Sequence, residues 1–459
     1  ICPLTLYYKK SDFFLPRFFN KFLLGSGQIY MIEIEKESRR RVERAILIGI
    51  QEPLAQADEV NEHLDELEEL VGNLGISTIQ RQIVALREIN PQFFIGSGKA
   101  AEIAQLYQEL EADVIVFDCD LSPSQQRNWE RLIKGCVIER QEVIIDIFAD
   151  RASTREAVLQ VELARLQYSL PRLTRAWTHL SRQKGGAKGT KGEGETQIEI
   201  DRRLVKSRIA NLLKELSAVR QQRSTTRKQR SKNELPLGAI VGYTNAGKSS
   251  LLNLLAQSDV LVEDKLFATL DPTTRRITLP NRSNILLTDT VGFVRKLPHT
   301  LIDAFKSTLE EAVLADFLIL VMDISSPNFE DHWATTLSVL EDLGVKPEDK
   351  EFVVVFNKID REHDQFARVR AHSLMPDAYF ISTKTGEGVT ELVEKLMAIS
   401  NRHSNLTRLK LPPSRFDLVA QAHEDGQVFE CHYWDDGEVE LILNLALKFR
   451  SKYQKYIVN

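Results

Sequence analysis

The sequence predicts an α/β protein: an N-terminal α/β domain with an antiparallel helical hairpin arm, then a Ras-like phosphate-loop domain and a small α+β C-terminal domain. Three observations support this prediction. Short apolar runs alternate with helix-type patterns from Arg44 to about Arg151, leucines then recur at spacings of three and four, and a G-x-x-x-x-G-K-S motif follows a short apolar run at Leu237. The expected boundaries are 1–30 for an extension without its own fold, 31–151, 152–232, 233–402 and 403–459.

The composition is typical of a large soluble chain. Its 459 residues suggest about three domains, and a hydrophobic content of 43% supplies sizeable cores. The net charge of -5 argues against general attraction to DNA or RNA, so an RNA contact has to be local. The four cysteines form no C-x-x-C pair, which fits a reducing cytoplasm and argues against structural zinc. No apolar run reaches the roughly 20 residues of a membrane span. We expect a cytoplasmic monomer without an integral membrane segment.

The first 30 residues are rich in aromatic side chains but lack a continuous apolar core. Proline and polar residues interrupt the run from Phe13 to Leu24, whereas a secretory signal needs about 7 to 15 uninterrupted apolar residues. The favoured interpretation is a translated upstream extension. The alternative is a membrane-surface anchor, which would give the protein a membrane-peripheral fraction.

Residues 44–151 alternate between strand-type and helix-type patterns. Strands are predicted at 45–48, 79–84, 114–117 and 136–138, and helices at 60–70, 100–110 and 125–133. This alternation is typical of a largely parallel sheet. Gly96-Ser97-Gly98-Lys99 precedes the second helix and is interpreted as a helix-start turn. A second nucleotide site there is the alternative, although its spacing differs from that of a phosphate loop.

The next segment predicts a two-helix coiled coil. Leucines 159, 163, 166 and 170 form one seam, and apolar residues 198, 205, 209, 212, 216 and 219 form the other. The connecting loop has no acidic residue and six basic ones: Arg172, Arg175, Arg182, Lys184, Lys188 and Lys191. Its glycines, its basic side chains and the rings of Trp177 and His179 suit contact with RNA phosphates and unstacked bases. A solvated flexible loop is the alternative. A second basic run at 220–232 is consistent with a plain linker.

The stretch from Gly242 to Ser249 matches the phosphate-binding loop pattern, between a strand at 237–241 and a helix at 250–256. The terminal glycines let backbone N–H groups turn toward a β-phosphate. Lys248 neutralises β- and γ-phosphate charge, and the Ser249 hydroxyl can ligate Mg²⁺. We predict nucleotide contacts along the whole loop: Gly242, Tyr243, Thr244, Asn245, Ala246, Gly247, Lys248 and Ser249.

Three later stretches specify the nucleotide. Asp289-Thr290-Val291-Gly292 ends an apolar strand, which directs the first carboxylate toward Mg²⁺ through water and the last amide toward the γ-phosphate. The carboxylate of Asn357-Lys358-Ile359-Asp360 can accept hydrogen bonds from guanine N1 and N2, a donor pair that adenine lacks. Ser382-Thr383-Lys384 would close over the base. With the phosphate loop, these motifs predict that the chain binds GTP.

From Arg44 to about Ile399 the chain resembles the HflX family of ribosome-associated GTPases. The resemblance rests on long motifs: LSPSQQRN from Leu121, DIFADRA from Asp146, LPRLTRAWTHLSRQ from Leu170, GETQIEIDRR from Gly194 and FATLDPTTR from Phe267. It implies a translation-factor-class GTPase that associates with the large ribosomal subunit, its arm engaging ribosomal RNA; relatives are thought to split stalled ribosomes. It also implies nucleotide contacts at Phe267, Ala268, Thr269, Leu270 and Asp271. Residues 408–459 resemble the small C-terminal domain of some relatives.

Three positions depart from the family pattern. Glu193 stands where relatives usually have Pro, Lys188 reads as an insertion, and Ser382-Thr383 replaces the usual Ser-Ala. The first two affect the details of the arm's contact with RNA. The third should be tolerated, because the backbone makes most of the contact with the base.

For hydrolysis we predict a catalytic set of Lys248, Thr269 and Gly292, with Ser249 and Thr269 as Mg²⁺ ligands, the threonine by family register. Ras-like proteins place Gln directly after D-x-x-G, whereas this chain has Phe293. An apolar side chain cannot orient water by hydrogen bonding. We therefore expect slow intrinsic turnover that another element completes, most plausibly the ribosome.

Two alternatives stay open at this point. Asn245 occupies the loop position where monovalent-cation-dependent GTPases have an Asn that ligates K⁺, but a hydrogen bond that shapes its own loop explains it equally well. The alternative function is a GTP-gated RNA-handling or assembly scaffold that hydrolyses little GTP.

Overall fold

The computed structural model describes residues 42–53, 57–175, 193–230, 235–257, 266–267, 269–270, 272–295, 311–345, 350–362, 364–403, 406–445 and 447–458. The chain divides into two compact units, Ile1–Val143 and Ile144–Asn459. The predicted N-terminal extension and loop residues 176–192 lie outside the described ranges. Among the helices that are described, none is long and apolar enough to cross a membrane.

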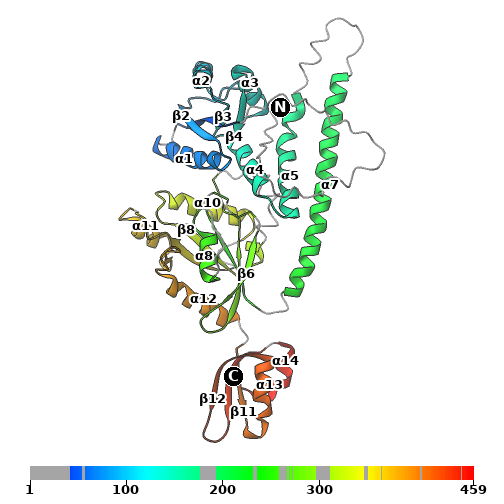
Figure 1. Ribbon diagram of the computed structural model, residues 1–459, viewed down its shortest axis with the longest axis vertical. Helices are drawn as coiled ribbons and strands as arrows, with labels where there is room; N and C mark the ends of the chain where they lie inside the picture. The colour runs from blue at the N-terminus through cyan, green and yellow to red at the C-terminus, as the bar shows by residue number, and fades with distance from the viewer. Residues whose placement is uncertain are drawn as a thin grey trace, which may run out of the picture. The chain divides into compact units, whose positions relative to one another are not determined.

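The first unit contains the predicted parallel sheet. Its strands are β1 (Arg44–Gln51), β2 (Ser77–Ala85), β3 (Val114–Phe117) and β4 (Cys136–Glu139), in the order β2-β1-β3-β4 and parallel throughout. The helices between them are α1 (Ala57–Asn73), α2 (Ser97–Glu109) and α3 (Pro123–Ile133) (Figure 1). The α3 indole of Trp129 is fully buried against Phe93 and Phe117 and donates to the Phe93 carbonyl at 2.8 Å. The predicted α/β architecture is confirmed.

The glycine-rich stretch before α2 is a helix start. Gly96 is the N-cap, and the helix begins at Ser97. The Lys99 ammonium lies 2.8 Å from the Glu102 carboxylate of the same helix. The stretch therefore has the helix-start geometry that was expected of it.

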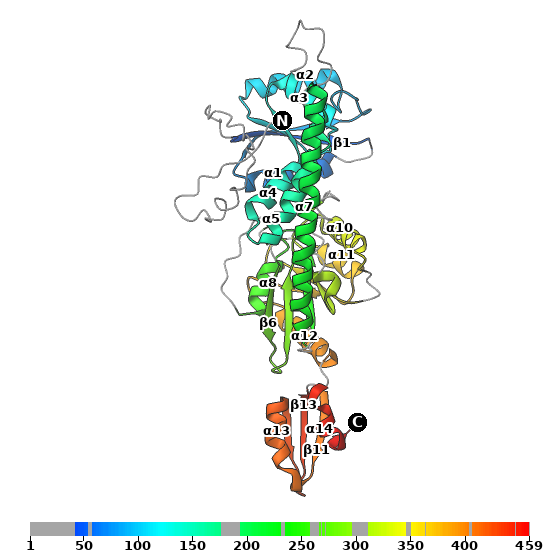
Figure 2. The same cartoon turned by 90° about the vertical axis from the view of Figure 1, so that its right-hand side faces the viewer.

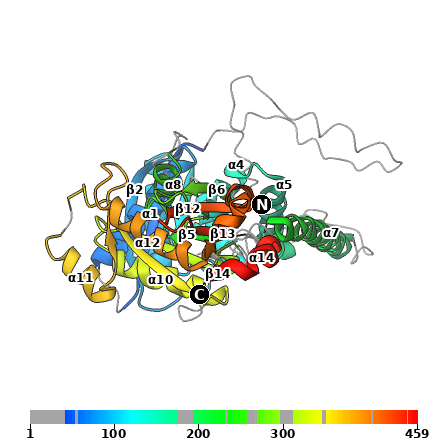
Figure 3. The same cartoon turned by 90° about the horizontal axis from the view of Figure 1, so that it is seen from below.

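Two antiparallel helices form the arm. After α4 (Arg140–Arg151), α5 (Arg155–Ser169) leads into the short 3-10 turn η1 (Arg172–Arg175), and α7 (Glu193–Arg230) runs back along α5 (Figures 2 and 3). Four buried leucines hold them together: Leu159, Leu163, Leu212 and Leu216. Ion pairs Arg155–Glu215 and Glu162–Arg208 fix the antiparallel register. Because α7 continues to Arg230, the basic run at 220–230 is helical.

A six-stranded sheet follows, in the order β10-β9-β8-β5-β7-β6. Its strands are β5 (Leu237–Gly242), β6 (Thr273–Thr278), β7 (Asn284–Asp289), β8 (Phe317–Asp323), β9 (Glu351–Asn357) and β10 (Tyr379–Phe380). β6 is antiparallel to β7, and the other neighbours are parallel. Since β5 lies between β7 and β8, the strand order reverses beside β5, where open α/β sheets bind ligands.

Helices cover both faces of this sheet. α8 (Lys248–Leu255) and α12 (Val389–His403) pack on one face, and α10 (Phe329–Asp342) and α11 (Ala367–Leu374) pack on the other. The two apolar clusters bury the strands on both sides, which explains why β8 and β9 read as continuous apolar runs. The result is a rigid platform beneath the loops that leave the strand ends.

The last part of the chain is a small α+β domain that contains a separate four-stranded sheet. Strands β11 (Leu406–Leu411), β12 (Gly426–Tyr433), β13 (Val439–Leu445) and β14 (Ile457–Val458) are antiparallel in the order β12-β13-β11-β14. Helices α13 (Asp417–Asp425) and α14 (Leu447–Tyr453) accompany them (Figure 2). Inward-facing leucines of β11 and β13 pack around Tyr453, which is fully buried.

Candidate nucleotide-binding site

The phosphate loop has the backbone that its sequence predicts. Gly242 ends β5 with φ 145°, and Gly247 precedes α8 with φ 95°, both in a region that favours glycine. Space also excludes side chains there. A Cβ on Gly242 would lie 2.1 Å from the Val321 carbonyl oxygen, and one on Gly247 would lie 2.1 Å from Asn357 Nδ2. The loop can therefore approach a ligand with its backbone.

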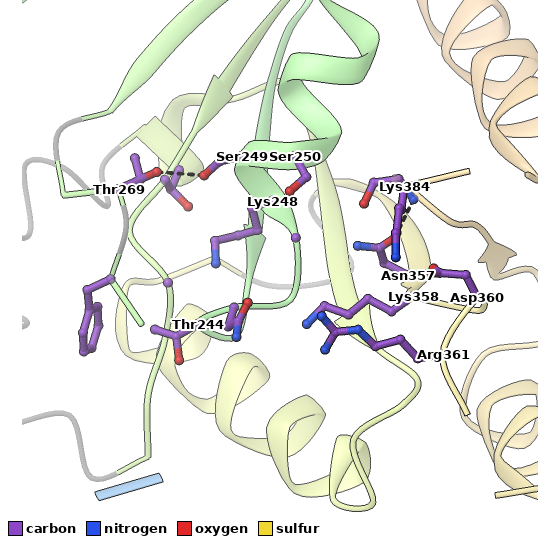
Figure 4. Close-up of a pocket in the computed structure, with 16 residues that line it drawn as sticks. Thr244, Lys248, Ser249, Ser250, Thr269, Asn357, Lys358, Asp360, Arg361 and Lys384 are labelled. Carbon is purple, nitrogen blue, oxygen red and sulfur yellow. Dashed lines mark hydrogen bonds between the residues drawn. The ribbon is translucent and has the colours of Figure 1, made fainter. Parts of the chain in front are cut away.

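A cavity of about 230 Å³ opens at the end of β5, between the loops after β5, β7 and β9 (Figure 4). Fourteen of its lining residues were predicted from the sequence: Thr244, Asn245, Gly247, Lys248, Ser249, Phe267, Thr269, Thr290, Gly292, Asn357, Lys358, Asp360, Thr383 and Lys384. The fold thus gathers all four motifs at one cavity.

Three oxygen-bearing side chains meet on the α8 side of the cavity. The Ser249 hydroxyl donates to Asp289 Oδ2 at 2.6 Å, and Thr269 Oγ1 donates to the same oxygen at 2.9 Å. The hydroxyls of Ser249 and Thr269 lie 2.7 Å apart (Figure 4). The other carboxylate oxygen of Asp289 is buried and has no hydrogen-bond partner among the described residues. Hard oxygen donors with a spare carboxylate oxygen suit Mg²⁺ and its water ligands. The residues present fit the ion that the motifs imply.

Lys248 is held in a dry environment. Its side chain is buried, and its ammonium donates to the Tyr243 carbonyl at 2.7 Å. Tyr243 belongs to the phosphate loop, so the ammonium lies where a bound phosphate would also contact it. Burial lowers the pKa of Lys248 to about 8, with Asp289 opposing the shift and Lys358 adding to it. A bound polyphosphate would add negative charge beside this ammonium and favour its protonated form.

On the base side, Asn357 joins two loops that are distant in sequence. Its Nδ2 donates to the Ala246 carbonyl at 2.9 Å, and its Oδ1 accepts from the Thr383 N–H at 3.0 Å. Asp360 Oδ1 accepts from the Ser382 hydroxyl at 2.6 Å. This hydrogen bond holds the pKa of Asp360 below its usual value, so the carboxylate stays ionised and oriented. The arrangement matches a guanine-reading carboxylate.

Backbone hydrogen bonds connect the D-x-x-G loop to the phosphate loop. The Thr244 N–H donates to the Phe293 carbonyl at 2.7 Å, and the Phe293 N–H donates to the Gly242 carbonyl at 3.1 Å. The Tyr243 ring stacks on His332 of α10 at 3.7 Å, and its hydroxyl accepts from the Arg295 N–H at 2.9 Å. The Phe293 side chain is 1% exposed and packs in the apolar core. It therefore does not reach a water in the cavity.

Several other predicted residues are buried beneath the cavity lining and do not line the cavity themselves. Tyr243, Ala246, Leu270 and Val291 are buried outside its lining, as is Asp289. Thr290 also lines the cavity while its hydroxyl donates to the Ile240 carbonyl at 2.8 Å. Phe267 has φ 56° and packs edge-to-face on Phe148 of α4, with ring centroids 4.6 Å apart. Ala268 and Asp271 lie outside the described residues.

Sequence reasoning missed three residues at this site. Ser250 and Arg361 line the cavity, and each directly follows a predicted motif residue, so adjacency was an available signal. Asp323, at the end of β8, lies 2.6 Å from the Lys358 ammonium and holds that side chain. An acidic residue at the carboxyl end of a buried parallel strand was its only signal.

This arrangement of a phosphate loop, a D-x-x-G loop and an N-K-x-D loop around one cavity defines a P-loop GTPase. Family models match in chain order: "GTP-binding GTPase N-terminal" over residues 61–149, "GTP-binding GTPase Middle Region" over 151–230 and "50S ribosome-binding GTPase" over 238–358. The chain is 48% identical to a GTPase HflX of Akkermansia muciniphila over 94% of this chain and all of that one. It is 39% identical to GTPase HflX of Escherichia coli over 88% and 94%.

The chain therefore belongs to the HflX family of GTPases, and it hydrolyses GTP. Among solved structures, it is similar to a GTP-binding protein from Sulfolobus solfataricus in complex with GDP. That similarity has 26% identity and a TM-score of 0.41, and it covers 79% of this chain and all of that one.

Proposed function

We propose that this GTPase binds the large ribosomal subunit and acts in ribosome splitting, rescue or biogenesis under GTP control. The observation that carries the proposal is the position of Phe293. Its side chain is buried in the core directly after the D-x-x-G glycine, so no glutamine is available there to orient the attacking water. A partner has to complete the site. The matched family model, named for 50S binding, favours the large subunit as that partner.

The proposal extends to the domains and their place in the cell. Its boundaries are 31–151 for the N-terminal domain, 152–232 for the arm, 233–402 for the GTPase domain and 403–459 for the C-terminal domain. The arm would contact ribosomal RNA with its basic loop, as a monomer in the cytoplasm. Local basic residues would carry this contact, because the chain has a net charge of -5.

We assign the residue roles from the cavity outward. Lys248 neutralises charge on the β- and γ-phosphates, and the Gly292 amide donates to the γ-phosphate. Ser249 and Thr269 would hold Mg²⁺, with Asp289 accepting from its water ligands. When bound, the ion stabilises the charge that develops between the β- and γ-phosphates. Asp360 reads the guanine, and Asn357 keeps the base loop against the phosphate loop.

K⁺ is proposed as a second cation beside Asn245. This residue lines the cavity with φ 58°, a left-handed backbone that Asn adopts more readily than most residues. The backbone conformation alone would explain Asn245, so the experiment has to decide. GTPase rates in KCl, NaCl and choline chloride at constant ionic strength should be highest in KCl. Equal rates in all three salts, or stimulation that survives Asn245→Ala, would exclude the cation role.

The test of the main proposal is the GTPase rate with and without purified large ribosomal subunits. We expect large subunits to accelerate turnover and small subunits to leave it unchanged. A GTP-gated scaffold would bind large subunits without any gain in rate. That outcome would contradict the proposed function and favour the alternative.

A further inference from the structure

The hydroxyl of Thr244 is buried, and no group in the described part of the chain forms a hydrogen bond with it. Thr244 is the third residue of the phosphate loop, and it is only 5% exposed. Its Oγ1 has no hydrogen-bond partner among the described residues. A buried hydroxyl is stable only when it is hydrogen-bonded. This conformation therefore implies a partner that binds at the site.

The surroundings of Thr244 identify where that partner lies. Thr244 and Lys248 both line the nucleotide cavity (Figure 4), and so does Gly292. A Cβ added to Gly292 would come within 2.8 Å of three atoms: Thr244 Cα, Thr244 Cγ2 and Lys248 Nζ. Residue 244 thus stands beside both groups that the proposed roles place on the γ-phosphate.

The backbone of Thr244 is fixed in this place. Its N–H donates to the Phe293 carbonyl at 2.7 Å, so the residue cannot move away from the D-x-x-G loop without breaking that bond. Rotation about χ1 exchanges the hydroxyl with the methyl group and needs no backbone change. One χ1 rotation can therefore bring the hydroxyl to the phosphate end of the cavity, where the methyl group now lies beside Gly292.

We propose that Thr244 is a catalytic residue whose hydroxyl donates a hydrogen bond to a γ-phosphoryl oxygen. In hydrolysis, the water oxygen forms a bond to the γ-phosphorus as the bond to the GDP oxygen breaks, and the water proton ends on the products. The threonine keeps its own proton throughout. Its hydrogen bond orients the γ-phosphoryl group and shares the charge that the transition state spreads over the three equatorial oxygens. Phe293 offers no such donor.

Three substitutions of Thr244 in the full chain distinguish the effect of the hydroxyl from the effect of side-chain volume. Thr244→Ser keeps the hydroxyl, Thr244→Val keeps the shape, and Thr244→Ala removes both. Single-turnover GTP hydrolysis should fall about tenfold to a hundredfold in the Val and Ala variants and stay within about threefold of wild type in the Ser variant. GDP affinity should be unchanged in all three. Affinity for GDP with aluminium fluoride, which mimics the transferring group, should fall only in the Val and Ala variants.

Wild-type hydrolysis by Thr244→Ala would overturn the proposal. A loss confined to the Val variant would also overturn it, since added bulk at the phosphate would then explain the effect. An equal loss in the Ser variant would show that the methyl group matters instead of the hydroxyl. Thermal melting with GDP confirms folding, and the Ser and Ala variants decide the question if the Val variant does not fold.

Discussion

Asp360 connects one carboxylate to base selection. The Ser382 hydroxyl donates to it at 2.6 Å and keeps its pKa low. Asp360→Asn should weaken GTP binding about tenfold to a thousandfold, because losing charge-assisted hydrogen bonds costs on the order of 2 to 4 kcal/mol. It should also favour xanthosine triphosphate, whose base carbonyl can pair with an amide. Competition binding with the two nucleotides measures both effects.

A matched control is Asp364→Asn, which neutralises a nearby carboxylate that pairs with Arg370 and is absent from the cavity lining. GTP affinity should be unaffected by this control. Unchanged GTP affinity in Asp360→Asn itself would contradict the base-reading assignment.

Lys248 makes nucleotide binding dependent on pH. Burial lowers its pKa to about 8, so the side chain loses its charge above that pH in the nucleotide-free protein. A phosphate raises the pKa again, and binding above about pH 8 therefore takes up a proton. We expect GDP affinity to fall as pH rises from about 8 to 9, by up to about tenfold per pH unit. Calorimetry in buffers of different ionisation enthalpy counts the protons taken up.

Guanosine serves as the control ligand for this titration, because it fills the base site without touching Lys248. Its affinity should not follow the same curve. Folding stability should depend on pH in the opposite direction from GDP affinity. Between about pH 8 and 10.5 the unfolded chain binds more protons than the folded one, so the stability of the nucleotide-free protein rises with pH. If GDP and guanosine showed the same pH dependence, the lysine would not be the titrating group.

At the scale of elements, a small apolar seam joins the two helices of the arm. Among the described residues, four buried leucines, two ion pairs and three partly buried side chains connect α5 to α7; the partly buried ones are Leu166, Ile209 and Val219. Leu212→Ala removes a fully buried member and should lower the free energy of unfolding of the hairpin by about 2 to 4 kcal/mol. Limited proteolysis and denaturant unfolding measure the loss. GDP affinity should be unchanged, because none of these leucines lines the cavity.

The neighbouring leucine provides an internal control. Leu213 is 50% exposed on the same helix, so Leu213→Ala should change stability by no more than about 0.5 kcal/mol. Equal protease sensitivity in the two variants would show that the hairpin is not held by the leucine seam.

For the whole molecule, the proposed arm contact predicts a salt dependence. Neutral replacements of Arg182, Lys184, Lys188 and Lys191 should weaken binding to large subunits and flatten the slope of log affinity against log salt. Each lost phosphate contact removes nearly one unit of slope, about 0.7 to 0.9. Nucleotide affinity should be retained. Sedimentation with large subunits at several salt concentrations gives the slope directly.

Neutralising the same number of exposed basic residues elsewhere tests whether position or charge matters: Arg87, Arg131, Lys134 and Arg368. This control should keep most of the slope. A slope equal to wild type in the arm variant would remove the arm from the RNA contact.

The sequence by itself determined the elements and the chemistry class. Alternating apolar runs, the glycines of the phosphate loop and the N-K-x-D turn are local signals, because each depends on residues within a few positions of one another. The long family motifs extended this to the arm, and a separate resemblance of residues 408–459 to a small domain of some relatives extended it to the C-terminal unit. Even the left-handed backbone at Gly247 was readable, since a phosphate loop requires it.

Only the tertiary structure decided how these parts work together. Asn357 holds Ala246 from 111 positions away, and Asp323 supports Lys358 across neighbouring strands. Thr244 is hydrogen-bonded through its backbone to the D-x-x-G loop, while its hydroxyl has no partner among the residues that the structure describes. The order of the strands brings these partners together, and no local pattern encodes that order. Likewise, the sequence showed that Phe293 cannot bind water, but only its packing in the core showed that it leaves the cavity altogether.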